Sequence, residues 1–513
     1  MKWRLNFHVQ NFNFNQLHYN PFAIFSFLPE KEGKKILSEM IIEFRDGECL
    51  AYFPLAFMDK MVSVILEQII TDETWADQVN TQCEAINWEY FRFAQTLLEE
   101  NVSQMSGEKL LDNLTKLREL QQAAHFFAIT TTWFVDSNKE EFSQYLRNAL
   151  KEHFETQGIS DPIFFMDTFV LLTTPTKENF AFREQIDFLK LCKAIRDDQI
   201  VLKIFREKKN LEEIWKDIGD KARECIRTHW KKWQWIPYGY IGPAFTLEHY
   251  IFEIQKTLLH VENIDALLFE ENSRFQKVLV SQNALREKIH LSKNLDHIFA
   301  IARDIIWLKE FRKSTYFHGH FVLDFFTAEI ARRIHVSHKQ ANHMLPDEHK
   351  AAFLSGNVDE HFINERMNYH ILYVMDETKK VEWFIGEKAR VYRESLDIEE
   401  EKISGELGWH GSCACPGEVE GEVKIINTPE EMEKMNKGDI MLALTTYPSL
   451  LPAMKKAAAI VTEDGGITCH AAIVAREFRI PCVVGVKKIS AFLKDGDWIN
   501  VNATEGKIQK IEK

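Results

Sequence analysis

The sequence predicts a multidomain α + α/β protein, with a large, mostly α-helical N-terminal region followed by a smaller C-terminal α/β domain. Glycine is the first indication, because ten of the 21 Gly lie in residues 1–400 and eleven in the remaining 113. From about residue 58 to residue 334, apolar residues recur at steps of three and four, as in amphipathic helices. Near the C-terminal end, an apolar run of strand length leads into paired glycines and a helix of small residues.

Composition narrows the class of protein. The chain has 513 residues and a net charge of −14, which leaves no basic excess for a general nucleic-acid binder or for anionic membrane surfaces. No early apolar run is long enough for a secretory signal or a membrane span, so a cytoplasmic protein is expected. The eight Cys form no CxxC pair, which favours reduced thiols. Cys413 and Cys415 are the one close pair and lack a second pair at zinc spacing, so no metal site is expected.

Four segments follow from the composition and the periodicity. Residues 1–57 are mixed and contain a predicted β-hairpin, because residues 40–53 alternate on both sides of Asp46-Gly47. Residues 58–394 are the predicted helical body, residues 395–407 an acidic linker, and residues 408–513 the C-terminal domain. Within the body, helical spacing is found at 58–70, 81–100, 108–135, 139–156, 178–207, 211–232, 246–260 and 294–334. Helix starts are expected at Ser106 and Ser137.

Two parts of the helical body allow alternative interpretations. Residues 230–243, rich in Trp, Tyr, Gly and Pro, are either a loop that faces a ligand or a packed connection between helices; packing is favoured because aromatic residues usually serve cores. Residues 300–372 contain a cluster of eight histidines, but no carboxylate completes a ligand set, so a solvated helix face is favoured over a metal site. The histidines are those at 318, 320, 335, 338, 343, 349, 361 and 370.

The most informative segment runs from Ala459 to Arg479. Its order is an apolar strand, a turn containing Gly465 and Gly466, and a helix that opens on Thr468, Cys469 and His470. The helix is expected to end near Arg479, because Pro481 disfavours helix at the residue before it and cannot extend it. A strand, a glycine turn and a helix N-terminus together outline a phosphate site.

The residue types in this segment suit phosphoryl chemistry. Glycines allow the backbone to turn tightly and to approach a ligand, and the first N–H groups of the helix favour an anion. Thr468 can cap the helix or donate its hydroxyl to a phosphoryl oxygen. His470 is the candidate nucleophile, since a neutral imidazole attacks well near pH 7. Spacing alone equally allows an N-capped surface helix with an incidental histidine.

The segment from Thr462 to Glu477, with its continuation to Gly485, resembles the phosphohistidine swivelling domain of phosphoenolpyruvate-utilising enzymes. That family includes phosphoenolpyruvate synthase, pyruvate phosphate dikinase and rifampin phosphotransferase. The resemblance extends over about the last fifth of the chain, through residues 416–423, 437–440, 446–448, 495–497 and 505–507. It implies that His470 carries a phosphoryl group and that Gly465, Gly466, Thr468 and Cys469 bind the phosphate. Asn502-Ala503 departs from the Asp-Gly that is usual in the family.

The resemblance also implies sites outside this domain. In the relatives an ATP-grasp domain charges the histidine, and a phosphoenolpyruvate-binding barrel follows the domain in the synthase and the dikinase. Residues 1–400 lack the glycine content and the Walker-type loop expected of such a donor domain, and the chain ends at Lys513. One component of a split phosphotransferase is therefore expected. ATP and magnesium would bind a separate ATP-grasp chain, with phosphoenolpyruvate as another donor, and the helical body would hold a small-molecule acceptor.

Two alternatives stay open. The chain could be a divergent protein resembling phosphoenolpyruvate synthase that acts with separately encoded partners. It could also be a non-catalytic binding or regulatory scaffold that retains a swivelling domain. An intact Thr-Cys-His with both glycines speaks against the scaffold, because an inactive site has no physical need for that arrangement.

Overall fold

The computed structural model forms two compact units. The helical unit contains residues 1–160 and 175–399, and the C-terminal unit contains residues 161–174 and 400–513. The structure describes all residues except 1, 10–29, 32–33, 36–38, 46, 56, 73, 126–133, 135–140, 209, 241, 376–379, 400–407, 428, 447–449, 464, 466–468 and 512–513. The helix start predicted at Ser137 and most of the predicted linker therefore lie outside the described residues.

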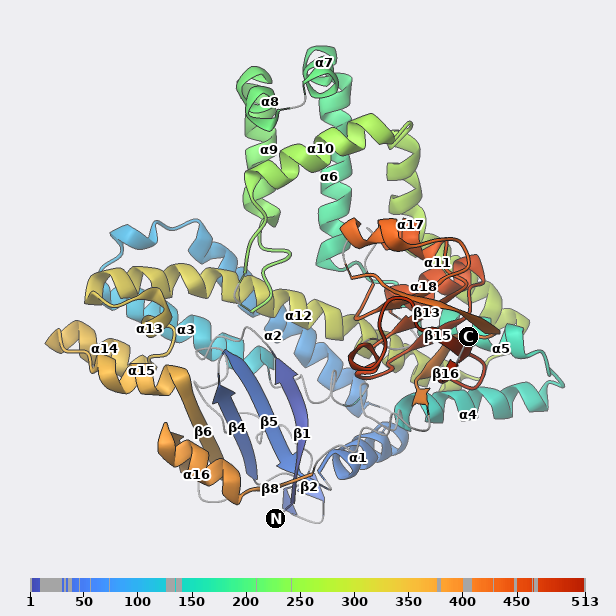
Figure 1. Cartoon of the computed structure of the whole chain (residues 1–513), viewed down its shortest axis with the longest axis horizontal. Helices are drawn as coiled ribbons and strands as arrows, with labels where there is room; N and C mark the ends of the chain where they lie inside the picture. The colour runs from blue at the N-terminus through green and yellow to red at the C-terminus, as the bar shows by residue number, and fades with distance from the viewer. Residues whose placement is uncertain are drawn as a thin grey trace. The chain divides into compact units, whose positions relative to one another are not determined.

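Helices make up most of the helical unit (Figure 1). Local caps set several of their ends: Asn179 begins α6, and Asp198 separates α6 from α7 by accepting hydrogen bonds from two backbone N–H groups. The predicted helix 178–207 is therefore two helices. The bounds are α1 Phe57–Thr71, α2 Trp75–Leu98, α3 Gly107–His125, α4 Glu141–Thr156, α6 Phe180–Asp197, α7 Gln199–Glu207, α8 Leu211–Asp217, α9 Gly219–Trp233, α10 Leu247–His260, α11 Ile264–Lys288, α12 Lys293–Ile334, α13 His338–Ala341, α14 Pro346–Ser355, α15 Glu360–Asn368 and α16 Glu387–Ser395.

The 42-residue helix α12 runs through the core of this unit and packs against α2 and α3. The contact with α2 is close because Gly319 has no side chain: a Cβ there would lie 1.7 Å from the Tyr90 hydroxyl oxygen. The Thr315 hydroxyl donates to Asn87 Oδ1 at 2.7 Å across the same contact. Since α12 is covered on several sides, many of its polar residues are buried as well as its apolar ones.

The prediction of a solvated face for residues 300–372 holds for Glu310, His335 and His361, which are exposed, but it is wrong for much of α12. His318 and His320 are 0% and 2% exposed, and Arg312, Glu329 and Arg366 are also buried. Burial lowers the pKa of both histidines to about 3, so they are neutral at physiological pH. The sequence misled here because polar residues at helical spacing are usually solvated, and only the tertiary contacts of α12 place them inside.

A six-stranded sheet completes the helical unit, in the order β7-β6-β4-β5-β1-β8. Strands β4 and β5 pair antiparallel on either side of Asp46-Gly47, where the hairpin was predicted. The prediction of helix through residue 394 is wrong for β6 and β7, and β8 lies within the predicted linker. The bounds are β1 Lys2–Val9, β4 Glu39–Arg45, β5 Glu48–Pro54, β6 Tyr369–Met375, β7 Lys380–Ile385 and β8 Asp397–Ile398, with the separate pair β2 Glu30–Lys31 and β3 Lys34–Lys35.

The C-terminal unit is built on an eight-stranded sheet in the order β10-β14-β13-β12-β11-β15-β16-β9, and it also includes α5 Pro162–Thr173. Strands β11 to β14 run parallel, and the outer strands pair antiparallel. Apolar clusters lie on both faces of the sheet. The bounds are β9 Trp409–His410, β10 Ser412–Cys415, β11 Glu418–Ile425, β12 Ile440–Ala443, α17 Leu451–Met454, β13 Ala459–Thr462, α18 His470–Phe478, β14 Cys482–Val484, β15 Trp498–Asn502 and β16 Lys507–Ile511. The predicted class, multidomain α + α/β, is therefore confirmed.

Candidate functional site

The candidate site lies where β13 ends and α18 begins. All four residues of β13 are buried, and the strand pairs in parallel with β12 on one side and β14 on the other. In open α/β sheets, ligands bind beyond the carboxyl ends of the parallel strands. The chain leaves β13 at this end, passes through residues 463–469 and enters α18 at His470.

Gly465 has a backbone conformation that other residues rarely adopt. Its φ is +109°, and a Cβ at this position would lie 2.9 Å from Cys469 Sγ and 3.0 Å from Cys469 Cβ. Both the dihedral angle and the lack of space therefore require glycine here. Cys469, directly before His470, therefore lies close to the backbone of Gly465.

The segment after β14 supports this turn. The N–H of Val486 donates to the Thr462 carbonyl at 2.9 Å, and the N–H of Ser490 donates to the Glu463 carboxylate at 2.5 Å. Gly485, with φ of +74°, leaves room for the Gly465 carbonyl, which would lie 3.2 Å from a Cβ. Gly485 and the residues that follow it thus have a structural reason to accompany the glycine turn in the sequence.

Helix α18 packs closely because its buried face is made of small residues. Ala471, Ala472 and Ala475 are at most 1% exposed and belong to the apolar cluster on this face of the sheet. The helix ends as predicted: Arg479 has a left-handed φ of +54°, and the N–H of Ile480 donates to the Ala475 carbonyl at 2.7 Å. His470 is the first residue of α18, so the free N–H groups and the positive end of the helix dipole lie at this residue.

Three of the predicted site residues have a described backbone, and the structure brings them together at this turn: Gly465, Cys469 and His470. Gly466 and Thr468 lie outside the described residues, as does the side chain of His470. Their predicted roles stay predictions. Within the described part of the chain, no three His, Cys, Asp or Glu side chains are grouped to hold a metal ion.

One residue at this turn was not predicted. Thr462 ends β13 with a side chain that is 0% exposed, and its hydroxyl has no hydrogen-bond partner among the described residues. Buried hydroxyls are usually paired, so an unpaired one beside a candidate phosphate site is notable. The sequence alone could have indicated Thr462, because it is a threonine at the end of an apolar strand and just before the glycine turn.

Comparison with known proteins identifies this domain. Residues 435–506 match the family model described as the mobile domain of PEP-utilising enzymes. A probable phosphoenolpyruvate synthase of Archaeoglobus fulgidus is 41% identical over 151 residues, which are 26% of this chain and 20% of the relative. The phosphoenolpyruvate synthase of Pyrococcus furiosus is 46% identical over 111 residues (22% and 14%), and that of Escherichia coli is 48% identical over 86 residues (17% and 11%).

Residues 435–506 therefore match the mobile domain of PEP-utilising enzymes, and the resemblance drawn from the motif is confirmed. The chain spans a fifth or less of the length of these synthases. Among solved structures, the holo-form of Thermococcus kodakaraensis aconitase X aligns with 20% of this chain and 98% of its own, at 20% identity and a TM-score of 0.17, which is too low to support a conclusion. No described helix is long and apolar enough to cross a membrane.

Proposed function

We propose that this chain is a phosphotransferase component in which His470 carries a phosphoryl group from a donor site to a small-molecule acceptor. The observation that carries the proposal is the position of His470 at the N-terminus of α18, directly after the glycine turn of a family mobile domain. A histidine carrier needs an unprotonated nitrogen and donors for the phosphoryl oxygens. The helix N-terminus favours both, because its positive end disfavours the imidazolium and attracts the phosphoryl anion.

The chemistry consists of two displacements at phosphorus. In the first, an imidazole nitrogen of His470 attacks the terminal phosphoryl group of the donor, so that an N–P bond forms and the P–O bond to the leaving group breaks. In the second, the acceptor hydroxyl attacks the same phosphorus, the N–P bond breaks and the hydroxyl proton is released. The first N–H groups of α18 and the Thr468 hydroxyl would face the phosphoryl oxygens in both steps.

The donor is expected on a partner chain that carries an ATP-grasp domain with ATP and magnesium, and phosphoenolpyruvate is the other donor to test. This expectation rests on the glycine-poor composition of residues 1–400. The helical unit is the proposed location of the acceptor. The predicted acidic linker, residues 395–407, would serve as the hinge of a carrier domain.

The test is intact-mass spectrometry of the full chain at neutral to basic pH, because phosphohistidine is labile in acid. The chain is incubated with ATP and magnesium, with phosphoenolpyruvate, or with ATP and a candidate ATP-grasp partner. We expect one phosphoryl adduct in at least one condition, and the donor that produces it identifies the charging site.

Three variants test the assignment. His470→Ala is expected to abolish the adduct, whereas His410→Ala, an exposed histidine in β9 of the same unit, leaves it unchanged. Thr468→Ala is expected to slow formation of the adduct without preventing it, because the helix N–H groups remain. A full adduct in His470→Ala would refute the assignment, and a folded chain with no adduct under any condition would favour the scaffold.

A further inference from the structure

The helical unit contains a pocket of about 600 Å³, and six of its fourteen lining residues are aromatic. It is formed within this unit by α2, by α6 and the residues before it, by α9 and the turn that follows, and by α11. Its size lies in the range of small-molecule sites, which is roughly 300–1,000 Å³. Six aromatic side chains contribute to the walls: Trp88, Phe91, Phe180, Phe182, Trp233 and Trp235.

Hydrogen bonds and ring contacts hold these aromatic walls in place. The Trp235 indole N–H donates to the Lys232 carbonyl at 3.0 Å, and the Trp233 indole N–H donates to Asp187 Oδ2 at 3.2 Å. The Phe91 and Phe180 ring centroids are 4.7 Å apart, and Trp88 lies 5.7 Å from Phe180. Rings fixed in this way lose little freedom when a flat molecule stacks against them.

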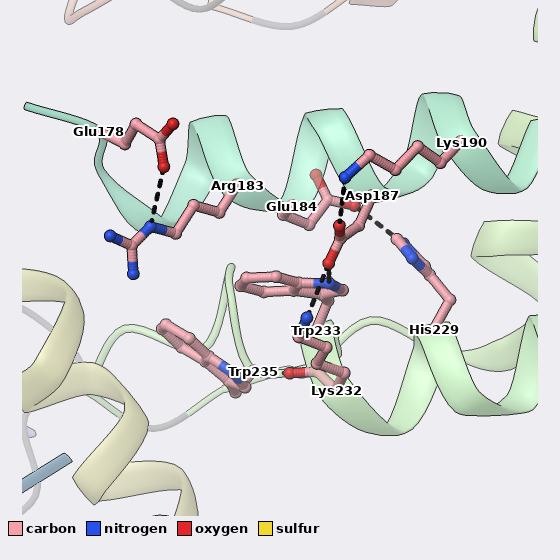
Figure 2. A network of polar contacts seen from close by, with 9 residues as sticks. All are labelled: Glu178, Arg183, Glu184, Asp187, Lys190, His229, Lys232, Trp233 and Trp235. Atoms are coloured by element: carbon pink, nitrogen blue, oxygen red, sulfur yellow. Dashed lines mark hydrogen bonds and ion pairs between the residues drawn. The ribbon is translucent and has the colours of Figure 1, made fainter. Parts of the chain in front are cut away.

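Charged side chains lie along the same pocket (Figure 2). Asp187 binds the Lys232 ammonium at 2.7 Å and lies 3.7 Å from that of Lys190, and Arg183 lies 3.3 Å from the Glu178 carboxylate. Three cations thus face two carboxylates, in a chain whose net charge is −14. Because two lysines share Asp187, one positive charge is left to attract an anion. These lysines are 59% exposed, so their ammonium groups can move to meet a ligand.

The pocket also answers the question left open for residues 230–243. Trp233 and Trp235 are 4% and 2% exposed, as the favoured packed connection requires, yet both also line the pocket. The two interpretations are therefore compatible, because a side chain can be packed on one face and form a wall with the other.

We propose that this pocket binds a planar aromatic small molecule that carries an acidic group. The aromatic walls select a flat apolar body, and the excess of cations selects a carboxylate or a similar anion. Binding of such a molecule does not depend on the proposed function. Only the further step, in which a bound aromatic hydroxy acid accepts the phosphoryl group, rests on the proposed function. Its hydroxyl oxygen would then form the P–O bond as the N–P bond of phosphohistidine breaks, with release of the hydroxyl proton.

Binding is tested by calorimetry and tryptophan fluorescence on the full chain without any phosphoryl donor. The probes are 3-hydroxy-2-naphthoate, the neutral 2-naphthol and the non-aromatic cyclohexanecarboxylate. We expect the hydroxynaphthoate to bind most tightly, 2-naphthol more weakly, and cyclohexanecarboxylate most weakly. Added salt should weaken binding of the naphthoate and leave that of 2-naphthol unchanged. Equal affinity for all three probes, or no binding, would overturn the proposal.

Matched variants locate the site. Trp88→Leu removes one aromatic wall and should weaken naphthoate binding about fivefold, from the usual value of an aromatic pair. Trp215→Leu, in α8 and outside the pocket, is its control. Lys190→Gln should weaken binding of the naphthoate about threefold and not that of 2-naphthol, as expected for an exposed charge. Its control is Lys203→Gln on α7. If Trp88→Leu does not fold, the exposed lysine pair still decides the matter, and equal effects of Lys190→Gln and Lys203→Gln would refute the site.

The two proposals fail separately. His470→Ala should bind the naphthoate as the unaltered chain does, since binding needs no phosphoryl group. A phosphohistidine adduct without naphthoate binding would leave the carrier role intact and remove the pocket ligand. Naphthoate binding without a phosphohistidine adduct would support the pocket ligand and remove the carrier role.

Discussion

Substitution of Gly465 by alanine tests how the turn before the candidate nucleophile is built. Gly465 has φ of +109°, and its added Cβ would lie 2.9 Å from Cys469 Sγ. Gly438, in the same unit, has φ of +100° but no neighbouring atom within 4 Å of an added Cβ. The two alanine variants therefore share the backbone strain, and only Gly465→Ala adds a steric overlap.

The expected magnitudes follow from these two contributions. A residue forced into a glycine-only backbone region costs about 1–3 kcal/mol, which is the whole effect expected for Gly438→Ala. An overlap of this size in a packed region adds about 1–3 kcal/mol. Gly465→Ala is thus expected to reduce local stability by roughly 2–6 kcal/mol in total, unless Cys469 moves away with the start of α18. Both the strained turn and a displaced Cys469 would move the backbone of His470, which follows Cys469 directly.

Hydrogen–deuterium exchange of the full chain measures this loss of local stability. The exchange rates of the peptides that contain β13 and α18 give the free energy of local opening. We expect faster exchange in both peptides for Gly465→Ala than for Gly438→Ala, together with slower formation of the phosphoryl adduct. Equal exchange in the two variants would show that the contact with Cys469 does not constrain the turn. Unchanged adduct formation in a variant with altered exchange would show that the turn does not position the nucleophile.

Two further predictions concern buried charges of the helical unit. Glu348→Gln should lower stability by about 2 kcal/mol in thermal unfolding, because it removes the carboxylate charge that accepts hydrogen bonds from the buried Arg366 guanidinium at 2.8 and 2.6 Å, whereas the exposed Asp347→Asn should not. Equal losses in both variants would contradict this reasoning. Glu329→Gln should destabilise the unit at neutral pH, because the hydrogen bond from Arg332 lowers the pKa of Glu329 to about 2 from an ordinary value of 4.5. A carboxylate whose pKa is lowered in the folded state stabilises the fold above pH 4.5, and this contribution is lost as the pH falls toward 2. The free energies of unfolding of the unaltered chain and of the variant should therefore converge near pH 2. A difference that does not change with pH would count against the ion pair.

The fold illustrates which kinds of structure a sequence pattern can reveal. The helices were predictable where a single apolar stripe met a capping residue, as at Ser106, whose hydroxyl accepts the Lys109 N–H at 3.1 Å. Strands β6 and β7 were not, because they lie in a mainly helical stretch. Strand β7 pairs with β6, and β6 joins the sheet by pairing with β4, more than 300 residues earlier in the chain. A strand is stabilised by its partner, and the partner of β6 is not visible in the local pattern.

The sequence by itself determined the candidate phosphate site, because a strand, a glycine turn and a helix N-terminus are contiguous in the chain and their backbone requirements are local. Only the tertiary structure showed that Gly465 is also required by its contact with Cys469, and that Thr462 buries its hydroxyl beside the turn. Only the tertiary structure, too, brought α2, α6, α9 and α11 together around an aromatic pocket. Such a pocket depends on side chains from segments up to about 180 residues apart, as Trp88 and Asn272 are, and no periodicity in the chain records which of them will meet.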